Sequence, residues 1–418
     1  MPALDPLARQ LARLRAYALF TYPFACVPFL YLFFREHGID DGSYGEIIGA
    51  YYLAMFVAEV PTGVLADRIG YKPMLVAGPL LLALGFLLLL ACPTYGGFLA
   101  GEVLLGLGHA VLSGPPAAML YESLRAAGQQ HRFLREESRL GALRMLGTGS
   151  AFLLGGALAR SGTGGQAWQL TIVATCGLTS AAAVLAAGLA PVRPPGTLHF
   201  AAFARHVGQD VRNPAVLWLL GYWIVLFALL RFPFHDYQPW LREAGGQVAL
   251  LRDPLFVGGL FAAMNLFAAP LSALVPHLVE RWGRRALFWG MPLVLCGSLL
   301  VMAAERHAAV SGHGGGGLVW LGVGMFFVQQ VPFGMHQALL AEFVNHRIGS
   351  AARTTVLSAL SLGARAVYAA VNVALFWLQG AHGMAVAFAV AGAGGLVATT
   401  AVLLLRPRGL LRGDGPVA

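Results

Sequence analysis

Apolar residues fall into twelve blocks that are separated by short polar segments. The blocks span approximately 16–34, 44–66, 73–91, 97–122, 141–160, 167–190, 215–234, 255–279, 286–304, 317–342, 354–378 and 383–405. An α-helix needs about 20 such residues to cross the hydrocarbon layer of a bilayer. The pattern predicts an all-α polytopic membrane protein with twelve transmembrane helices. The first is expected as one continuous helix over 16–34, because no signal-peptide cleavage pattern follows it.

Composition and charge agree with this class. Hydrophobic residues make up 58% of the 418 residues and charged residues only 11%, against about 25% charged in soluble domains. The net charge of +9 would suggest a nucleic-acid partner, but 21 of the 28 Lys and Arg lie in the connections on one side of the predicted spans. Basic residues accumulate on the cytoplasmic side of membrane proteins. We therefore expect a multi-pass protein of the inner (plasma) membrane with both termini cytoplasmic, and no nucleic-acid partner.

The segment 191–214 divides the chain into an N-terminal six-helix bundle, 1–190, and a C-terminal one, 215–418. An interfacial helix inside this cytoplasmic linker and an ordinary polar linker are equal alternatives. The hexapeptide DRIGYK at 67–72 returns as ERWGRR at 280–285, an offset of 280 minus 67, or 213 residues. Such an offset is typical of a duplicated six-helix unit with a substrate site between its halves.

The stretch Gly63–Lys72, GVLADRIGYK, resembles the signature loop between helices two and three of the major facilitator superfamily. The twelve spans, the central linker and the second copy extend the resemblance over the whole chain. It implies two pseudo-symmetric six-helix bundles, usually monomeric, and a gating loop whose acidic residue, here Asp67, helps to hold the cytoplasmic side closed. The gating-loop residues are Gly63, Asp67, Arg68, Gly70, Lys72, Glu280, Arg281, Gly283 and Arg285.

Two further patterns of that superfamily match in part. The fourth-helix pattern carries a basic residue before its glycines, whereas Glu102 precedes Gly106 and Gly108 here. Gly147, Gly155 and Gly156 resemble the fifth-helix pattern of proton antiporters. The alternative is that these glycines only permit close helix packing, which is common in membranes.

Ionisable side chains in the spans are candidates for proton coupling, because charge in hydrocarbon is costly. Glu102, Gly106, His109 and Ser113 fall at i, i+4, i+7 and i+11, on one face of a helix. We expect Glu102 to bind the coupling proton with the help of His109. Glu59 is a third candidate, and the resemblance makes it a cross-domain partner of Arg365; packing within its own half is the alternative.

Polar residues at helical spacing also mark a substrate cavity. Arg365, Tyr368 and Asn372 fall at i, i+3 and i+7. Gln329 and His336 fall at i and i+7, and Gln330 follows Gln329 directly. In the superfamily, helices one, four, seven and ten line the cavity. The full set of cavity candidates is Tyr17, Thr21, Tyr222, Trp223, Gln329, Gln330, His336, Arg365, Tyr368 and Asn372.

Lys72 is the chain's single lysine and lacks a nucleotide-binding P-loop around it. The expected function is therefore gradient-driven transport of a small organic solute by alternating access, with proton-coupled export and without a cofactor or metal. Uptake by the same fold is an alternative. A membrane-embedded enzyme is another, but its motifs are missing and no aspartate lies inside the twelve blocks. A non-transporting sensor is the last alternative.

Overall fold

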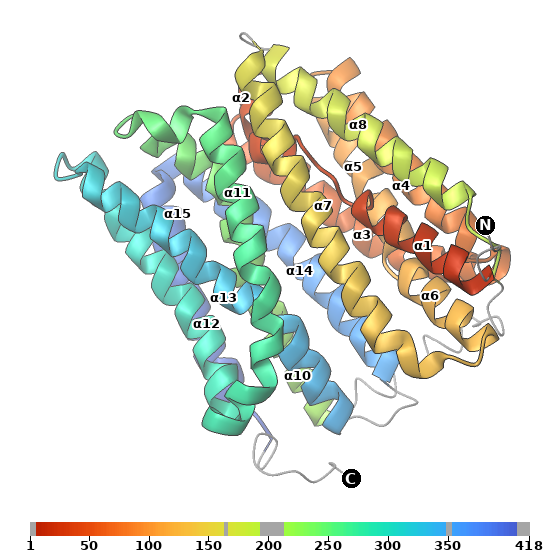
Figure 1. Cartoon of the computed structure of the whole chain (residues 1–418). Coiled ribbons are helices and arrows are strands. Elements are labelled where there is room, and N and C mark those ends of the chain that lie inside the picture. The colour runs from red at the N-terminus through yellow and green to blue at the C-terminus, as the bar shows by residue number, and fades with distance from the viewer. Residues whose placement is uncertain (1–5, 163–165, 193–212, 348–352, 408–418) are drawn as a thin grey trace. The chain divides into compact units, whose positions relative to one another are not determined.

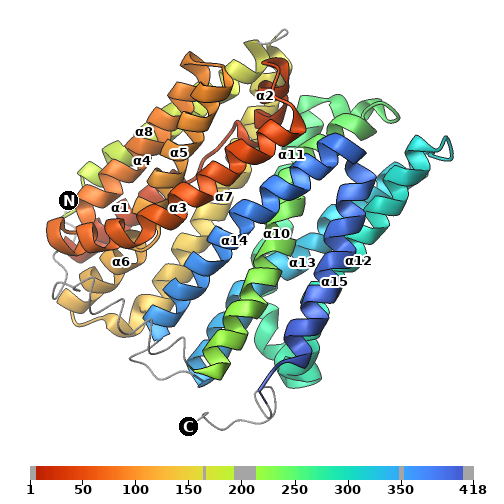
Figure 2. The ribbon, with the colours of Figure 1, turned by 180° about the vertical axis from the view of Figure 1, so that it is seen from behind.

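The computed structural model describes residues 6–162, 166–192, 213–347 and 353–407. Helices connected by short turns make up these ranges, and no strand occurs within them (Figures 1 and 2). The proposed interfacial helix of the linker lies outside the described residues. The contacts divide the chain into two units, each of which is described by itself.

Unit 1 comprises Met1–Ile39, Ala50–Phe200 and Asp253–Leu266. Its elements are α1 (Pro6–Leu19), η1 (Val27–Phe29), α2 (Leu30–Glu36), most of α3 (Asp41–Ile69), α4 (Tyr71–Ala91), α5 (Tyr95–Leu112), α6 (Pro115–Ala126), η2 (Gln130–Arg132), α7 (Phe133–Ser161), α8 (Gln166–Ala187) and most of α11 (Pro254–Ala268). Within it, α4 packs against both α5 and α8, and α1 packs against α7 and α8.

Unit 2 comprises Asp40–Gly49, Ala201–Arg252 and Phe267–Ala418, so the first turns of α3 belong to it. Its other elements are α10 (Pro214–Ala244), η3 (Ala249–Arg252), η4 (Ala269–Leu274), α12 (Val275–Val310), α13 (Gly316–Arg347), α14 (Arg353–His382) and α15 (Met384–Leu404). Here α15 packs against α12, α10 and α14.

Polar caps fix where several helices begin. The Asn213 side chain accepts from the N–H of Ala215 at 2.9 Å, and Asp253 accepts from Leu255 at 2.8 Å. These oxygens satisfy N–H groups that have no partner inside the helix. The long apolar blocks thus begin and end at short polar signals.

Ten described helical stretches are long and apolar enough to cross a membrane. One of them, Pro254–Val310, contains the two predicted blocks 255–279 and 286–304, and the others each match one block. None of the ten stretches contains the first predicted block, 16–34. The all-α membrane class is therefore established, whereas the number of twelve crossings stays a prediction.

The first predicted helix is interrupted, so the expectation of a continuous helix over 16–34 is wrong. Helix α1 ends at Leu19, and η1 begins only at Val27. Two threonines bind the backbone of this break: Thr148 donates to the carbonyl of Tyr22 at 3.1 Å, and Thr175 accepts from the N–H of Cys26 at 3.1 Å. Side-chain hydroxyls thus replace helical partners, which backbone in a membrane requires.

The glycines of α7 make room for the break. A Cβ atom on Gly147 would lie 2.0 Å from the carbonyl oxygen of Leu19, and one on Gly155 would lie 2.0 Å from that of Ala25. Gly156 faces the start of α11, where a Cβ would lie 2.7 Å from the carbonyl oxygen of Pro254. Each of these three glycines therefore allows close packing of α7.

The two copies of the repeated loop share an unusual backbone conformation. Gly70 has φ 90° and ψ 168°, and Gly283, 213 residues later, has φ 77° and ψ 156°. A side chain would strain both positions, because positive φ favours glycine. Each glycine turns the chain sharply between two helices, at equivalent positions of the sequence repeat.

We predict that Gly155→Ala destabilises the protein by about 1–3 kcal/mol, because its methyl group must displace the backbone of the break. The matched control is Gly177→Ala in α8, where an added Cβ meets nothing within 4 Å. Thermal unfolding of the purified variants in detergent measures the effect. Equal melting temperatures for the two variants would contradict the packing role.

Candidate functional site

The α5 helix carries the predicted proton-coupling face. Glu102 is only 4% exposed, and among the described residues no hydrogen bond or ion pair reaches its carboxyl group. One turn later, a Cβ on Gly106 would lie 2.4 Å from the carbonyl oxygen of Tyr51, so α5 and α3 touch at backbone distance. Glu102 also lies close enough to act electrostatically on Cys26, at the end of the break. A lone acid is thus held beside non-helical backbone.

His109 lies two turns after Glu102 and is surrounded by aromatic side chains. Its ring stacks on Tyr22 at 5.2 Å between centroids and meets Phe24 and Tyr51 edge to face at 5.6 and 5.4 Å. Its Nδ1 is 3.0 Å from the carbonyl oxygen of Leu105, which favours a proton on that nitrogen. The three rings and the imidazole form a cluster, called here the His109 cage, that joins the break to α3 and α5.

The remaining candidates of unit 1 are Tyr17, Thr21 and Glu59. Tyr17 is buried and donates to the carbonyl oxygen of Leu75 at 3.5 Å, while Thr21 donates to that of Tyr17 at 2.9 Å. Glu59 is half-buried. Because Glu59 belongs to unit 1 and Arg365 to unit 2, their pairing stays a prediction.

The gating-loop residues lie at helix ends, and most are accessible. Asp67 and Lys72 are half-buried, whereas Gly63 and Arg68 are exposed. In the second copy, Glu280, Arg281, Gly283 and Arg285 are all exposed. The gating role itself stays a prediction.

In unit 2, several candidates from α10 and α13 meet. His336 stacks on Trp223 at 5.5 Å, and Gln330 donates to the hydroxyl of Tyr237 at 3.2 Å. Gln329 donates to Ser298 at 3.0 Å, and its carbonyl oxygen is buried with no hydrogen-bond partner among the described residues. The Tyr222 hydroxyl is also buried with no hydrogen-bond partner among the described residues. Buried polar atoms without partners mark places where a ligand can bind.

Tyr368 and Asn372 fasten α14 to the start of α3. Tyr368 donates to the side-chain oxygen of Asn372 at 3.0 Å, and the Asn372 amide donates to the carbonyl oxygen of Gly45 at 2.9 Å. Asn372 is fully buried, and Arg365 on the same helix is half-buried. The Asn372 amide thus has its partners within unit 2.

The sequence interpretation missed the end of α10. This helix continues to Ala244 rather than ending near residue 234, so Asp236, just outside the predicted block 215–234, lies within α10 and is 0% exposed. Two prolines, Pro233 and Pro239, and the polar residues between them hid this extension. The signal that could have revealed the extension is a pair of charged residues, Arg231 and Asp236, on either side of the predicted end of the span at 234.

Arg231, near the end of the predicted block 215–234, also lies inside α10. Its guanidinium lies 5.4 Å from the ring centre of Phe227 and 5.9 Å from that of Phe333. No carboxylate of the described residues forms an ion pair with it. Aromatic faces stabilise a cation in this way but leave its hydrogen-bond donors available.

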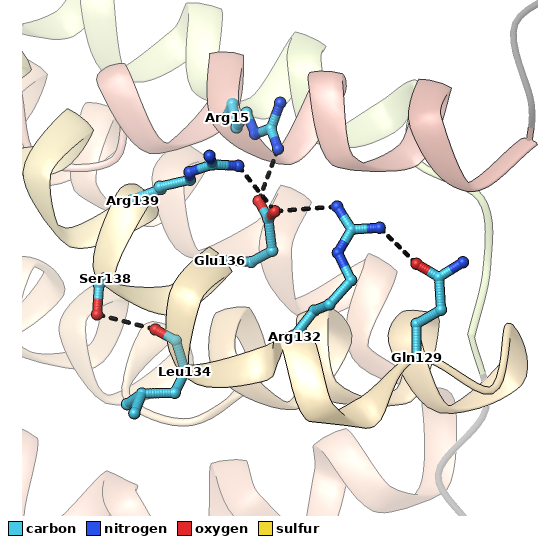
Figure 3. Close-up of polar contacts among 7 residues, drawn as sticks. All are labelled: Arg15, Gln129, Arg132, Leu134, Glu136, Ser138 and Arg139. Carbon is cyan, nitrogen blue, oxygen red and sulfur yellow. Dashed lines mark hydrogen bonds and ion pairs between the residues drawn. The ribbon is translucent and has the colours of Figure 1, made fainter.

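At the start of α7, three arginines converge on Glu136 (Figure 3). Its carboxylate is 1% exposed and lies 2.6 Å from Arg15, 3.2 Å from Arg132 and 3.0 Å from Arg139. Arg132 also donates to Gln129. We call this group the Glu136 cluster. It ties α1 to α7 and carries two more positive charges than negative ones.

In the described ranges, no three His, Cys, Asp or Glu side chains gather closely enough to hold a metal ion. The chemistry available is therefore that of buried acids, histidines, one aromatic-framed arginine and amide groups. Groups of these kinds can bind protons and small polar solutes.

A polytopic helical bundle with a broken helix and isolated ionisable groups at depth is the architecture of secondary transporters. Residues 16–372 match the family model of the Major Facilitator Superfamily, and the chain belongs to this superfamily. It is accordingly a multi-pass membrane transporter and not an enzyme.

Individual proteins resemble the chain in sequence or in fold. The inner membrane transport protein YajR of Escherichia coli (strain K12) is 29% identical over 148 residues, which are 34% of this chain and 30% of YajR. The nucleoside transporter NupG superposes with a TM-score of 0.79 at 10% identity, covering 95% of this chain and 98% of NupG. A POT family transporter in complex with 5-aminolevulinic acid superposes at 0.72 and 12% identity, covering 96% of each chain. At these identities the superpositions establish the fold alone.

We predict that Glu136→Gln destabilises unit 1 by about 1–3 kcal/mol, because it leaves three arginines without their shared partner. Over a third of each arginine side chain is exposed, so the effect should shrink at high salt. Glu137→Gln is the control, since Glu137 pairs with Arg144 alone. Thermal unfolding at low and high salt compares them. A larger loss for the control would contradict the role of the Glu136 cluster.

Proposed function

We propose that the protein moves a small organic solute across the membrane by alternating access and couples this movement to protons. The coupling proton binds Glu102, and His109 assists its transfer. The protein works as a monomer in the inner membrane, with both termini in the cytoplasm, and needs neither a cofactor nor a metal.

The observation that carries this proposal is Glu102 itself. An ionised carboxyl group inside a membrane is costly, so it needs a cationic partner or a proton. No described residue supplies a cation to Glu102. A buried acid that gains a proton when one side of the membrane is open and loses it when the other is open fulfils the coupling role.

The surroundings of Glu102 support a link between proton and solute. Glu102 and His109 are seven positions apart, which is about 10 Å along the helix axis. The His109 cage includes Tyr22 and Phe24 from the break. Because a break is free to change its backbone hydrogen bonds, a proton on α5 can influence the conformation of the first helix.

One feature of unit 2 supports the class of solute. Arg231 lies between Phe227 and Phe333 and suits an anionic group. We therefore propose an organic solute with an acidic group.

Export is the direction that we propose, on the fifth-helix resemblance of Gly147, Gly155 and Gly156. YajR, a partial relative named as an inner membrane transport protein, supports the proposed location. Uptake by the same mechanism would reverse the flux and leave the role of Glu102 unchanged.

We predict that Glu102→Gln abolishes accumulation driven by a pH gradient but retains exchange of solute across the membrane. A neutral amide keeps the size of the side chain and removes its titration. The solute is first selected by ligand-induced thermal stabilisation across a chemical library, and its flux is then measured in proteoliposomes with an imposed pH gradient.

The matched control is Glu122→Gln, because Glu122 is also buried but pairs with Arg125 at 2.7 Å. This variant should retain at least half of the gradient-driven flux. Uphill transport by Glu102→Gln at the wild-type rate would overturn the coupling role of Glu102.

A second variant tests the anionic group of the solute. Arg231→Gln should weaken binding of acidic solutes roughly 10-fold or more, since one charge-assisted hydrogen bond contributes about 1.5–3 kcal/mol. Binding of their neutral amide or ester analogues should change less than twofold. Titrations followed by thermal stabilisation measure both, and an equal loss for the two solute classes would contradict a direct contact.

A further inference from the structure

We propose that Asp236 of α10 and Gln379 of α14 form a second proton-binding site, in which a protonated Asp236 donates to the carbonyl oxygen of Gln379. The site is separate from Glu102, and its part in transport rests on the proposed function. Proton binding itself does not depend on that function and is tested without a solute.

The first evidence is a surplus of acceptors. Asp236 is 0% exposed, and neither of its oxygens has a hydrogen-bond partner among the described residues. Gln379 is 3% exposed, lies against Asp236, and its carbonyl oxygen also lacks a described donor. None of these three buried acceptor oxygens has a donor at hydrogen-bond geometry among the described residues, although the Gln379 amide lies close enough to Asp236 to act on it as a donor. Each such atom costs about 1–3 kcal/mol, and one proton on Asp236 supplies the missing O–H.

The second evidence is the orientation of the amide. The nitrogen of Gln379 lies 3.4 Å from Oδ2 of Asp41, the first residue of α3. This contact directs the amide into the cluster that includes Asp236. Gln379 thus adds a buried polar side chain with an unfilled acceptor to the acidic residues of the site.

Two acidic side chains act on Asp236, besides the amide of Gln379. The charged side chains that act on it are Asp41 of α3 and Glu243 of α10, and both are acidic. Like charges oppose ionisation of a buried acid. No basic side chain described in the structure offsets them at Asp236.

Groups on the other neighbouring elements are engaged elsewhere or are not ionisable. Glu305 and Arg306 of α12 pair with each other beside Trp240, which donates to Glu305 at 3.2 Å. His235 of α10 stacks on Tyr368 at 6.2 Å, and Arg252 of η3 lies against Gly245. Residues 384–404 of α15 and 316–335 of α13 include no ionisable side chain.

The site lies at one end of a tight seam between α14 and the first turns of α3, inside unit 2. Besides the contact of Gln379 with Asp41, Trp377 donates to Glu46 at 3.1 Å. A Cβ on Gly45 of α3 would lie 2.4 Å from the Cβ of Phe376 on α14, so these two helices pack closely. Loss of the proton would add a second negative charge beside Asp41. The seam is therefore expected to hold when Asp236 is protonated and to loosen when it is ionised.

Infrared difference spectroscopy tests this site directly. The purified protein at neutral pH should show the carbonyl stretch of a protonated carboxylic acid that disappears in Asp236→Asn. The band should remain in the control Glu243→Gln and also in Glu102→Gln. The Asn amide can donate to Gln379 as the protonated acid does, so this variant should melt within a few degrees of the wild type.

A second variant keeps the test independent of that substitution. Gln379→Leu removes the acceptor, so the Asp236 band should shift to higher frequency while its intensity stays. An unchanged band in Asp236→Asn, or an unshifted band in Gln379→Leu, would overturn the proposal. Loss of the wild-type band in sodium chloride but not in choline chloride would also overturn it, because sodium would then be the ligand. None of these results depends on solute transport, so failure here is distinguishable from failure at Glu102.

Discussion

Hydrocarbon offers no hydrogen bonds, so every polar group that enters it must find a partner inside the protein. This constraint shapes the break in the first helix. Seven residues leave the helical ladder between Leu19 and Val27, and their backbone would be unsatisfied in lipid. Thr148 and Thr175 bind part of this backbone, and the glycines of α7 bring it close enough for these bonds to form.

The same constraint explains why the buried ionisable side chains have different surroundings. The Glu136 carboxylate, at the end of a helix, is met by three arginines that solvent also reaches. Arg231 is met by aromatic faces, which tolerate its charge without neutralising it. Glu102 and Asp236 have no cation beside them in the described chain. The three arginines neutralise Glu136, whereas a proton is the simplest way to neutralise Glu102 and Asp236.

Features that depend on local pattern could be predicted from the sequence, whereas those that depend on contacts between distant segments could not. The repeated loop indicated two equivalent glycines, and Gly70 and Gly283 share a positive φ. The spacing of Glu102 and His109 predicted that both lie on one helix, and both belong to α5. Periodicity suffices here because a helix alone decides which residues share a face.

The break in the first helix, by contrast, requires the threonines of α7 and α8, more than a hundred residues away. The extension of α10 runs through Pro233 and Pro239, which ordinarily end a helix, and is stabilised by burial of the residues between them. The Glu136 cluster depends on Arg15, 121 residues earlier in the chain. Tertiary partners, not local propensity, decide such features.

The glycine contacts also limit where a conformational change can occur in unit 1. A Cβ on Gly108 would lie 3.1 Å from the carbonyl oxygen of Gly78 on α4, and Gly106 meets the backbone of α3. Helices in contact at backbone distance move together, because a packed interface does not deform gradually. Glu102 and His109 are therefore fixed to α3 and α4. The break has no helical ladder and is bound by two threonine hydroxyls, so it resists rearrangement less than the helices packed around it.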